Sequence, residues 1–365
     1  MKNQLETIAS VIKSTDSCAV ANFATKIERR TMFMRKERLP RITILAVGGT
    51  IAGKGANTTQ ITQYQAGVMT VEALIDAVPQ IRELAEVSGY QIANIPSFAM
   101  TDELWLQLAG KVNELLSHPN CDGVVITHGT DTLEETAYFL HLTVASDKPV
   151  VIVGAMRPAT ALSADGPLNL YNGVALAASE AARGHGVLIS LNGRIGSARE
   201  TTKLHTTAAD AFAPHEAGLL GYMVDGKPHF YYKSLRKHTV DSEFDVFGIP
   251  QLPRVNIFVG HSQDTRDLID AAVAAGTAGI VHAGTGNGGI FPLTRQGLQA
   301  SSKQGVVVVS ASRIGNGLVT AKPLDLESHF VVSDNLAPQK ARILLQLGLT
   351  KTNQSAEIQR MFQIY

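Results

Sequence analysis

Short runs of apolar residues alternate with longer segments of helical periodicity along most of the chain. Such runs, bounded by glycine or polar residues, are typical of strands that are buried on both faces of a parallel sheet. We therefore expect strands at 42–47, 91–95, 123–126, 150–153 and 186–191, and again at 255–259, 279–282 and 305–310.

Helices are predicted between these strands. Thr101 can cap a helix through its side-chain oxygen, and Asp102 and Glu103 add negative charge to its first turn. This helix should run to about Leu116. Further helices are expected at 165–181, 265–275, 294–304, 338–347 and 355–365. Regular alternation of strands and helices predicts an α/β fold with mostly parallel sheets covered by helices.

The alternation is interrupted once, at 232–252. This segment carries charges, Gly248 and Pro250, and it has little periodicity, which is typical of a linker. A chain of 365 residues is long enough for two α/β domains. We predict a larger N-terminal domain at 39–231, a linker at 232–252 and a C-terminal domain at 253–365, with 1–38 as an untypical extension.

Charge and composition disfavour several classes of protein. Lys and Arg number 32 and Asp and Glu number 32, so no basic excess attracts nucleic acid or an anionic membrane. No apolar run reaches transmembrane length, and the start of the chain lacks the apolar run of a secretory signal, so we expect a cytoplasmic protein. Cys18 and Cys121 form no metal-type pair, and we expect neither a metal nor another cofactor.

Gly48-Gly49-Thr50 follows the first predicted strand, at the end of the strand where parallel α/β sheets bind ligands. Two glycines let the backbone pass close to a ligand, and a threonine hydroxyl there can act as a nucleophile once a base activates it. The segment 48–55 nearly matches a phosphate loop, but Gly55 stands where a Ser or Thr would bind magnesium. In the alternative interpretation, Thr50 only satisfies backbone groups in a turn.

A second polar group follows the third predicted strand, in Thr127-His128-Gly129-Thr130-Asp131-Thr132. Its hydroxyls and carboxylate lie at another strand end, although Asp131 or Thr132 could equally be a helix N-cap. Lys203 could be an ordinary surface charge. Near hydroxyls and a carboxylate, however, it could be desolvated enough to act as a base.

Five motifs then occur in one order along the chain: Gly48-Gly49-Thr50-Ile51-Ala52-Gly53, His128-Gly129-Thr130-Asp131-Thr132, Gly154-Ala155-Met156-Arg157-Pro158, Ser163-Ala164-Asp165-Gly166-Pro167 and Gly284-Thr285-Gly286-Asn287-Gly288. Together they resemble the bacterial type II L-asparaginase and glutaminase-asparaginase family, over about 39–365. The resemblance implies a larger N-terminal catalytic domain with a mostly parallel sheet and a smaller, Rossmann-like C-terminal domain.

The resemblance also implies an activity. Members of the family hydrolyse the side-chain amide of asparagine, release ammonia and need no cofactor. Carried over to this chain, Thr50 is the acylated nucleophile, assisted by Tyr64 on a flexible lid at about 53–66. Thr130, Asp131 and Lys203 form a second, triad-like catalytic set.

Substrate binding and assembly are implied in the same way. The family forms homotetramers, in which a neighbouring subunit contributes residues to each site that binds the small amide substrate. The substrate-binding positions of this chain are Ser97, Phe98, Asp131, Ala155, Asn287 and Lys322.

The sequence departs from the family pattern at three places. Phe98 replaces a polar residue that helps bind the amino group of the substrate. Lys322 aligns with a glutamate lent by the neighbouring subunit, and Glu327 is the nearest acidic alternative. Ser146 replaces one of the disulfide cysteines of secreted members.

Three functions therefore remain open. The chain could be an amidase for asparagine or a close derivative, or an amidase for α-N-substituted asparagine such as fructose–asparagine. It could also be a ligand-binding homologue that has lost turnover. The presence of Thr50, Tyr64, Thr130, Asp131 and Lys203 argues against the third.

Overall fold

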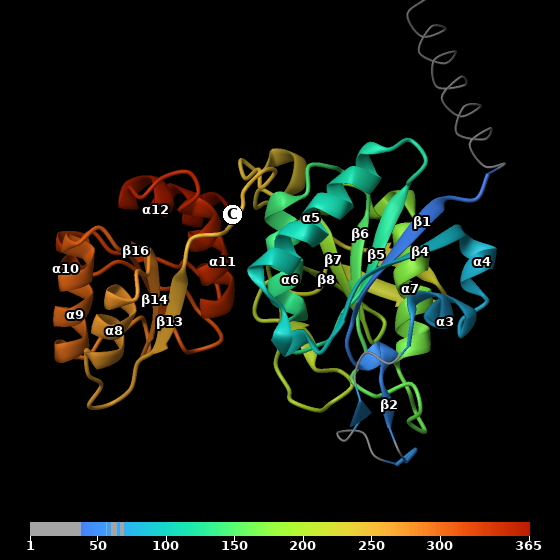
Figure 1. Cartoon of the computed structure of the whole chain (residues 1–365), viewed down its shortest axis with the longest axis horizontal. Helices are drawn as coiled ribbons and strands as arrows, with labels where there is room; N and C mark the ends of the chain where they lie inside the picture. Colours follow the sequence, from blue (N-terminus) through green and yellow to red (C-terminus); the bar gives the residue numbers. More distant parts are fainter. Residues whose placement is uncertain (1–37, 56, 60–63, 66–68) are drawn as a thin grey trace, which may run out of the picture. The chain divides into compact units, whose positions relative to one another are not determined.

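The computed structural model describes residues 38–55, 57–59, 64–65 and 69–365, with the backbone alone at 54–55 and 64–65 (Figure 1). The predicted extension at 1–38 lies outside the described residues except for Arg38. From Arg41 to Tyr365 the chain forms one compact unit that contains two main sheets.

The larger sheet has eight strands in the order β12-β11-β8-β7-β6-β5-β1-β4. The five strands from β4 to β7 in this order run parallel, and the other three pair antiparallel at one edge. The strands are β1 (Arg41–Gly48), β4 (Glu86–Ile95), β5 (Gly123–Thr127), β6 (Val150–Val153), β7 (Val187–Leu191), β8 (Arg194–Ser197), β11 (Gly221–Val224) and β12 (Lys227–Phe230). The predicted, mostly parallel sheet is confirmed.

Helices cover both faces of this sheet. Figure 1 shows α5 (Asp102–Ser117) and α6 (Leu133–Thr143) on one face, and α3 (Val71–Asp76), α4 (Ile81–Leu84) and α7 (Gly166–Ala177) on the other. Successive residues of β1 explain this: Leu45 belongs to the core cluster beneath α5 and α6, whereas Ile44 belongs to the opposite one. A strand buried on both faces is a continuous apolar run, which is the pattern that predicted it.

Several short elements lie outside the large sheet. Two are antiparallel pairs: β2 (Lys54–Gly55) with β3 (Tyr64–Gln65), and β9 (Thr201–Lys203) with β10 (Phe212–Pro214). In the described part of the chain, four single-turn 3-10 helices add to them: η2 (Thr50–Ala52), η3 (Ser97–Ala99), η4 (Glu180–Ala182) and η5 (Thr239–Asp241). Four of these short elements, η2, β3, η3 and β9, carry candidate site residues.

The smaller sheet is parallel throughout, in the order β13-β14-β15-β16. Its strands are β13 (Val255–Val259), β14 (Gly279–Gly284), β15 (Val307–Ser312) and β16 (Val331–Val332). The accompanying helices are α8 (Asp267–Ala274), α9 (Pro292–Lys303), α10 (Pro323–Glu327), α11 (Pro338–Gly348) and α12 (Ser355–Ile364) (Figure 1). Between the two sheets, 232–252 contains only the single turn η5. The exact domain boundaries stay a prediction.

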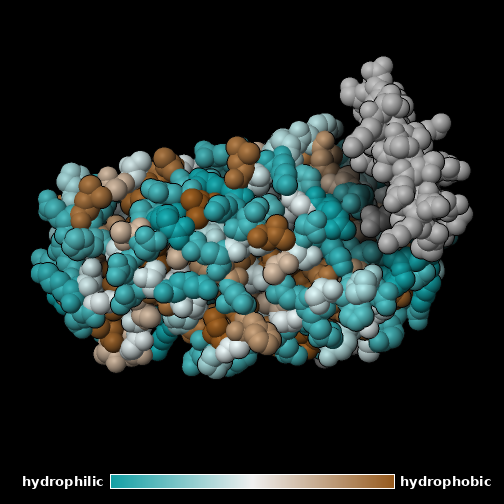
Figure 2. Space-filling model, turned by 90° about the horizontal axis from the view of Figure 1, so that it is seen from above, coloured by the Kyte–Doolittle hydropathy of each residue, from teal (hydrophilic) through white to brown (hydrophobic). Residues whose placement is uncertain are grey.

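The surface is mainly polar on the face drawn in Figure 2, where hydrophobic side chains are scattered among hydrophilic ones. None of the helices in the described part of the chain is long and apolar enough to cross a membrane.

Candidate active site

Four neighbouring parallel strands of the large sheet, β4, β1, β5 and β6, end at the same edge. Thr50 follows β1, Ser97 follows β4, Thr130 and Asp131 follow β5, and Ala155 follows β6. Parallel sheets bind ligands at this edge because loops from several strands converge there. The fold therefore gathers five of the predicted site residues.

Two glycines allow the loops after β1 and β5 to touch. Gly49 has a φ of 89°, and a Cβ on it would lie 2.3 Å from the Cα of Gly129. A Cβ on Gly129 would lie 2.7 Å from Ser97 Oγ. Only glycine fits at such an approach of backbone to backbone. Thr50 and Thr130, each the next residue along the chain, are thereby placed on adjoining loops.

Thr50 opens the single turn η2 and is buried. The Gly53 amide donates to the Thr50 carbonyl at 2.8 Å and closes the turn. Tyr64 lies in β3, where its backbone pairs with that of Gly55, and its side chain is not among those described. Most of the predicted lid at 53–66 beyond Gly55 likewise lies outside the described residues.

Thr130, Asp131 and Lys203 form one hydrogen-bonded group. The Lys203 amine on β9 donates to Thr130 Oγ1 at 2.9 Å and to Asp131 Oδ1 at 2.7 Å. Thr130 is buried and the lysine side chain is mostly so, whereas the Asp131 side chain is 61% exposed. The lysine is thus held between a hydroxyl and a carboxylate, and it can exchange a proton with either group.

Ser97 fixes the turn that carries this group. Its hydroxyl oxygen accepts from the Asp131 amide at 3.1 Å, and its carbonyl accepts from Thr132 Oγ1 at 2.7 Å. Thr132 occupies the N-cap position of α6 without using its side chain to cap the helix. Neither Thr132 nor Asp131 therefore acts as the side-chain cap that the sequence left open.

His128 stabilises the same turn from below. The Gly129 carbonyl can only accept, so His128 Nδ1 carries the ring proton and donates to it at 2.7 Å. Nε2 of the ring then accepts from the Thr136 hydroxyl at 2.9 Å, and Thr136 Oγ1 in turn accepts from Trp105 Nε1 at 2.9 Å. Burial lowers the pKa of His128 to about 4, so the ring is neutral. Both ring nitrogens are used internally, which makes His128 a structural residue.

The remaining predicted site residues are placed differently. Phe98, in η3, is 76% exposed, whereas Ala155 is fully buried and lies next to Gly166. Among the described residues, no hydrogen bond or ion pair joins Asn287 or Lys322 to the Lys203 group. Both belong to the C-terminal half of the chain.

Hydrogen bonds instead join the turn that carries Asn287 to the segment that carries Thr320 and Lys322. The side-chain nitrogen of Asn287 donates to Thr320 Oγ1 at 2.8 Å, and its side-chain oxygen accepts from the Thr320 backbone amide at 2.9 Å. The Lys322 amine donates to the carbonyls of Asn287 and Gly288. Lys322 therefore braces the turn that carries Asn287. Glu327, the acidic alternative, is exposed at the end of α10.

Sequence reasoning missed two charged residues beside this site. Glu134, in the first turn of α6, accepts from the Lys203 amide at 3.4 Å through Oε1. Its other carboxylate oxygen lies 3.7 Å from the amine of Lys340 on α11. A signal was present: Lys340 shares a helix face with Leu344 and Leu347, both of which are buried.

The comparisons with known proteins agree with this geometry. Residues 41–236 match the family described as "Asparaginase, N-terminal", and 254–362 match the "Glutaminase/Asparaginase C-terminal domain". The chain belongs to the asparaginase family. This family has the two-domain α/β fold described above, and the chain is an asparaginase-type amidohydrolase.

Individual asparaginases are similar over nearly the whole chain. L-asparaginase 2 of Bacillus subtilis (strain 168) is 51% identical over 330 residues, which is 90% of this chain and 88% of that protein. Glutaminase-asparaginase of Pseudomonas fluorescens biotype A is 44% identical over 95% of this chain and 94% of its own length. A crystal structure of a probable cytoplasmic L-asparaginase from Campylobacter jejuni superposes with a TM-score of 0.88 at 49% identity, covering 89% of this chain and 100% of that one.

A metal site is not visible in the described part of this asparaginase. No group of three or more His, Cys, Asp or Glu side chains there could hold an ion.

Proposed function

We propose that this asparaginase hydrolyses the side-chain amide of L-asparagine to aspartate and ammonia through an ester formed on Thr50. The observation that carries the proposal is the Lys203 amine, which lies within hydrogen-bonding distance of Thr130 and Asp131 on the loop beside Thr50. Acyl transfer from an amide requires a nucleophile that attacks the amide carbon and a proton donor for the nitrogen that leaves. Thr50 and the Lys203–Thr130 pair can supply these two groups. The names of the similar proteins point to the same substrate class.

In the first half of the reaction, the Thr50 hydroxyl oxygen attacks the amide carbon while its proton passes to Tyr64, which takes it up as the phenolate and holds it until the ester breaks. The amide nitrogen must gain a proton before it can leave as ammonia. The protonated Lys203 amine supplies it through the Thr130 hydroxyl, 2.9 Å away. Lys203 is then neutral, and the substrate is bound to Thr50 as an ester.

In the second half, water attacks this ester. The neutral Lys203 amine takes a proton from the water through Thr130, and the Asp131 carboxylate at 2.7 Å stabilises the ammonium that forms. Breaking the ester returns the proton to Thr50 and releases aspartate. The cycle needs no cofactor.

The proposal is tested by ammonia release from asparagine, glutamine, D-asparagine and α-N-substituted asparagines. L-asparagine should be hydrolysed fastest, and acid quenching during turnover should trap an acylated peptide that contains Thr50. An enzyme that turns over asparagine without any modified Thr50 peptide would remove the proposed nucleophile.

One observation favours a second candidate, an amidase for asparagine whose amino group is substituted. Phe98, at the position where the family places a polar residue for that group, is 76% exposed and cannot accept a hydrogen bond from an ammonium. Asp131 and Ser97 could still bind the other ends of such a substrate. If kcat/KM for free asparagine exceeds that for α-N-glycated or α-N-acyl asparagine by about a hundredfold, or about 2.7 kcal/mol, this candidate is wrong.

We also propose a cytoplasmic location and a homotetramer that shares its active sites between subunits. The location is supported by the similar Campylobacter jejuni protein, which is described as a probable cytoplasmic L-asparaginase. Cell fractionation tests the location, and a processed periplasmic form would contradict it.

A further inference from the structure

Lys340 is a buried lysine in the C-terminal half of the chain, on α11, and it is 1% exposed. Its amine donates to the carbonyl oxygens of Arg199 at 2.8 Å and Thr201 at 2.7 Å. Because alternate residues of an extended chain face the same side, one amine can hold both oxygens. These residues lead into β9, the strand that ends at Lys203.

Glu134 connects Lys340 to the segment that carries Thr130 and Asp131. It lies three residues after Asp131, in the first turn of α6, and is itself buried. One carboxylate oxygen lies 3.7 Å from the Lys340 amine, and the other accepts from the Lys203 amide. The Lys340–Glu134 pair therefore touches both segments that carry catalytic groups, β9 and the start of α6.

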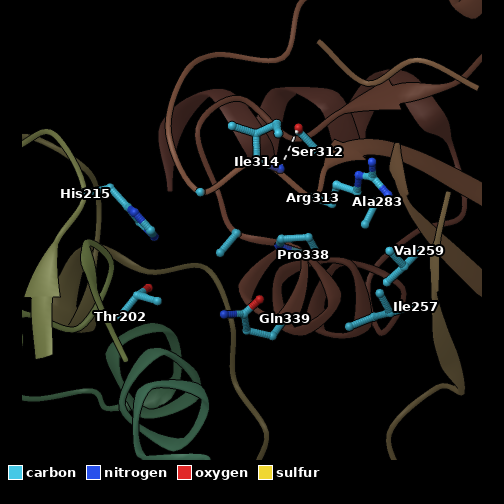
Figure 3. A pocket seen from close by; sticks show the side chains of 12 residues that line it. Thr202, His215, Ile257, Val259, Ala283, Ser312, Arg313, Ile314, Pro338 and Gln339 are labelled. Atoms are coloured by element: carbon cyan, nitrogen blue, oxygen red, sulfur yellow. Dashed lines mark hydrogen bonds between the residues drawn. The ribbon is translucent and has the colours of Figure 1, made fainter. Parts of the chain in front are cut away.

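Where β9 faces the start of α11, the two segments are separated by a cavity. Figure 3 shows the Thr202 side chain facing Pro338 and Gln339, at the start of α11, across a cavity of about 340 Å³. Polar contacts span the gap instead: besides Lys340, the Arg199 guanidinium donates to the Tyr365 carbonyl at 2.9 Å and to Asn335 Oδ1 at 2.8 Å. Hydrogen bonds from the C-terminal half thus add to the pairing of β9 with β10 in fixing the position of β9.

Net stability is a weak explanation for such an arrangement. Removing a lysine and a carboxylate from water costs free energy, and well-packed apolar side chains are commonly as stable as a buried ion pair. Burial lowers the pKa of Lys340 to about 8, against the opposing effect of Glu134 and Glu200. The pair does constrain geometry, because the Lys340 ammonium donates directional hydrogen bonds that fix the positions of the oxygens that accept them.

We propose that Lys340 is a positioning residue, which holds β9 against α6 so that the Lys203 amine stays within reach of Thr130 and Asp131. The inference rests on the proposed function of Lys203. It means that the C-terminal domain of a chain supports the active site of its own N-terminal domain.

The test compares two matched variants of the full-length enzyme, K340M and Q346M. Lys340 and Gln346 are both 1% exposed and lie on the same helix, and both bond to the N-terminal half, Gln346 through Asp102 Oδ2 at 2.7 Å. Only Lys340 touches the segment of β9. We expect K340M to lower kcat by about ten- to a hundredfold, the scale of a small misplacement of a catalytic group. KM should change less than about threefold, and Q346M should stay within about twofold of wild type in both.

A further variant separates positioning from stability. K340M leaves the Glu134 carboxylate buried without its cation, so its Tm should fall. K340M/E134Q removes that charge, and its Tm should recover, with E134Q alone as the reference. Its kcat should stay low, because the carbonyls of Arg199 and Thr201 still lack their donor. Recovery of kcat together with Tm would overturn the inference, as would a folded K340M with wild-type kcat.

K203M, assayed beside them, separates this inference from the proposed function. If K203M is inactive and K340M is fully active, only the positioning role is wrong. If K203M itself turns over asparagine at the wild-type rate, the proposed function is wrong and the positioning role falls with it.

Discussion

At the scale of single residues, the proposed chemistry depends on the Lys203 amine, the Asp131 carboxylate and the hydroxyls of Thr50, Tyr64 and Thr130. We expect T50A and K203M each to lower kcat by about a thousandfold or more, because residues that act as a unit lose most of their effect together. T202V is the matched control. Thr202 adjoins Lys203, but its buried hydroxyl has no hydrogen-bond partner among the described residues, so a methyl group in its place should leave turnover and folding intact.

Steady-state ammonia release, with circular dichroism to establish folding, is the measurement. Turnover at the wild-type level in folded T50A or K203M would contradict the mechanism. A large loss in T202V would mean that the effect at this strand is not specific to the lysine.

Buried histidines make the stability depend on pH. Burial lowers the pKa of His128 to about 4, and burial together with His238 lowers the pKa of His141 well below 6.5. In the unfolded chain both take up a proton near pH 6.5. Below that pH the unfolded state binds more protons, so the free energy of unfolding falls as the pH drops from about 6.5 toward 4. The fall is at most about 1.4 kcal/mol per pH unit for each histidine.

Urea unfolding between pH 7 and pH 5 measures this slope. H141Q should make it shallower, because glutamine cannot take up a proton and its oxygen can accept from the Val187 amide as His141 Nδ1 does at 3.0 Å. H118Q, at an exposed histidine, is the control and should leave the slope unchanged. Equal slopes in wild type and H141Q would show that His141 is not the group that titrates.

At the scale of elements, the site depends on how closely the loops after β1 and β5 approach. A methyl group on Gly49 would lie 2.3 Å from Gly129 Cα, and the φ of 89° adds strain, so the backbone would have to move. We expect G49A to destabilise the fold and to lower kcat by at least about a hundredfold, since Thr50 moves with it.

Gly110, exposed on α5, is the matched control, because a methyl group there meets nothing within 4 Å. G110A should raise the free energy of unfolding by about 0.5–1 kcal/mol, the helix preference for alanine, and leave kcat unchanged. Urea melts and ammonia assays of the two variants provide the comparison. Wild-type turnover in G49A would mean that the close approach is not required.

β6, which is buried on both faces, has the predicted bounds because its apolar run ends at Gly154 and at Pro149. β13 also has the predicted bounds, although it is an edge strand in which only Val255 is buried. β4 begins at Glu86 rather than at 91, since its first part is an exposed edge that has no apolar run. α6 was missed because almost every residue in it is buried, so the helix lacks the polar face that creates a periodic pattern.

The same limit applies to the site. Thr50 and Thr130 follow apolar strands and could be located as strand-end hydroxyls. Lys340 could be placed on the buried face of its helix, but its pairing with Glu134 could not be predicted, because the two residues are far apart in the sequence. Only the folded chain brings them together.

At the scale of the whole molecule, the position of Asn287 decides how many chains make one active site. Its turn is held rigidly by Thr320 and by the Lys322 amine. No described hydrogen bond or ion pair links it to the Lys203 group of its own chain. The resemblance implies that Asn287 binds substrate in the site of a second copy, and we therefore expect a homo-oligomer.

Mixed oligomers test this arrangement. K203M damages the N-terminal part of a site, and N287A should lower turnover by at least about tenfold by damaging the part that another chain supplies. When the two variants are unfolded together and reassembled, a shared site can combine an intact Lys203 from an N287A chain with an intact Asn287 from a K203M chain. Random assembly makes about a quarter of the sites complete, so activity should rise well above that of either variant alone. If each chain formed its own site, every site in the mixture would carry one defect, and activity would stay at the average of the two variants.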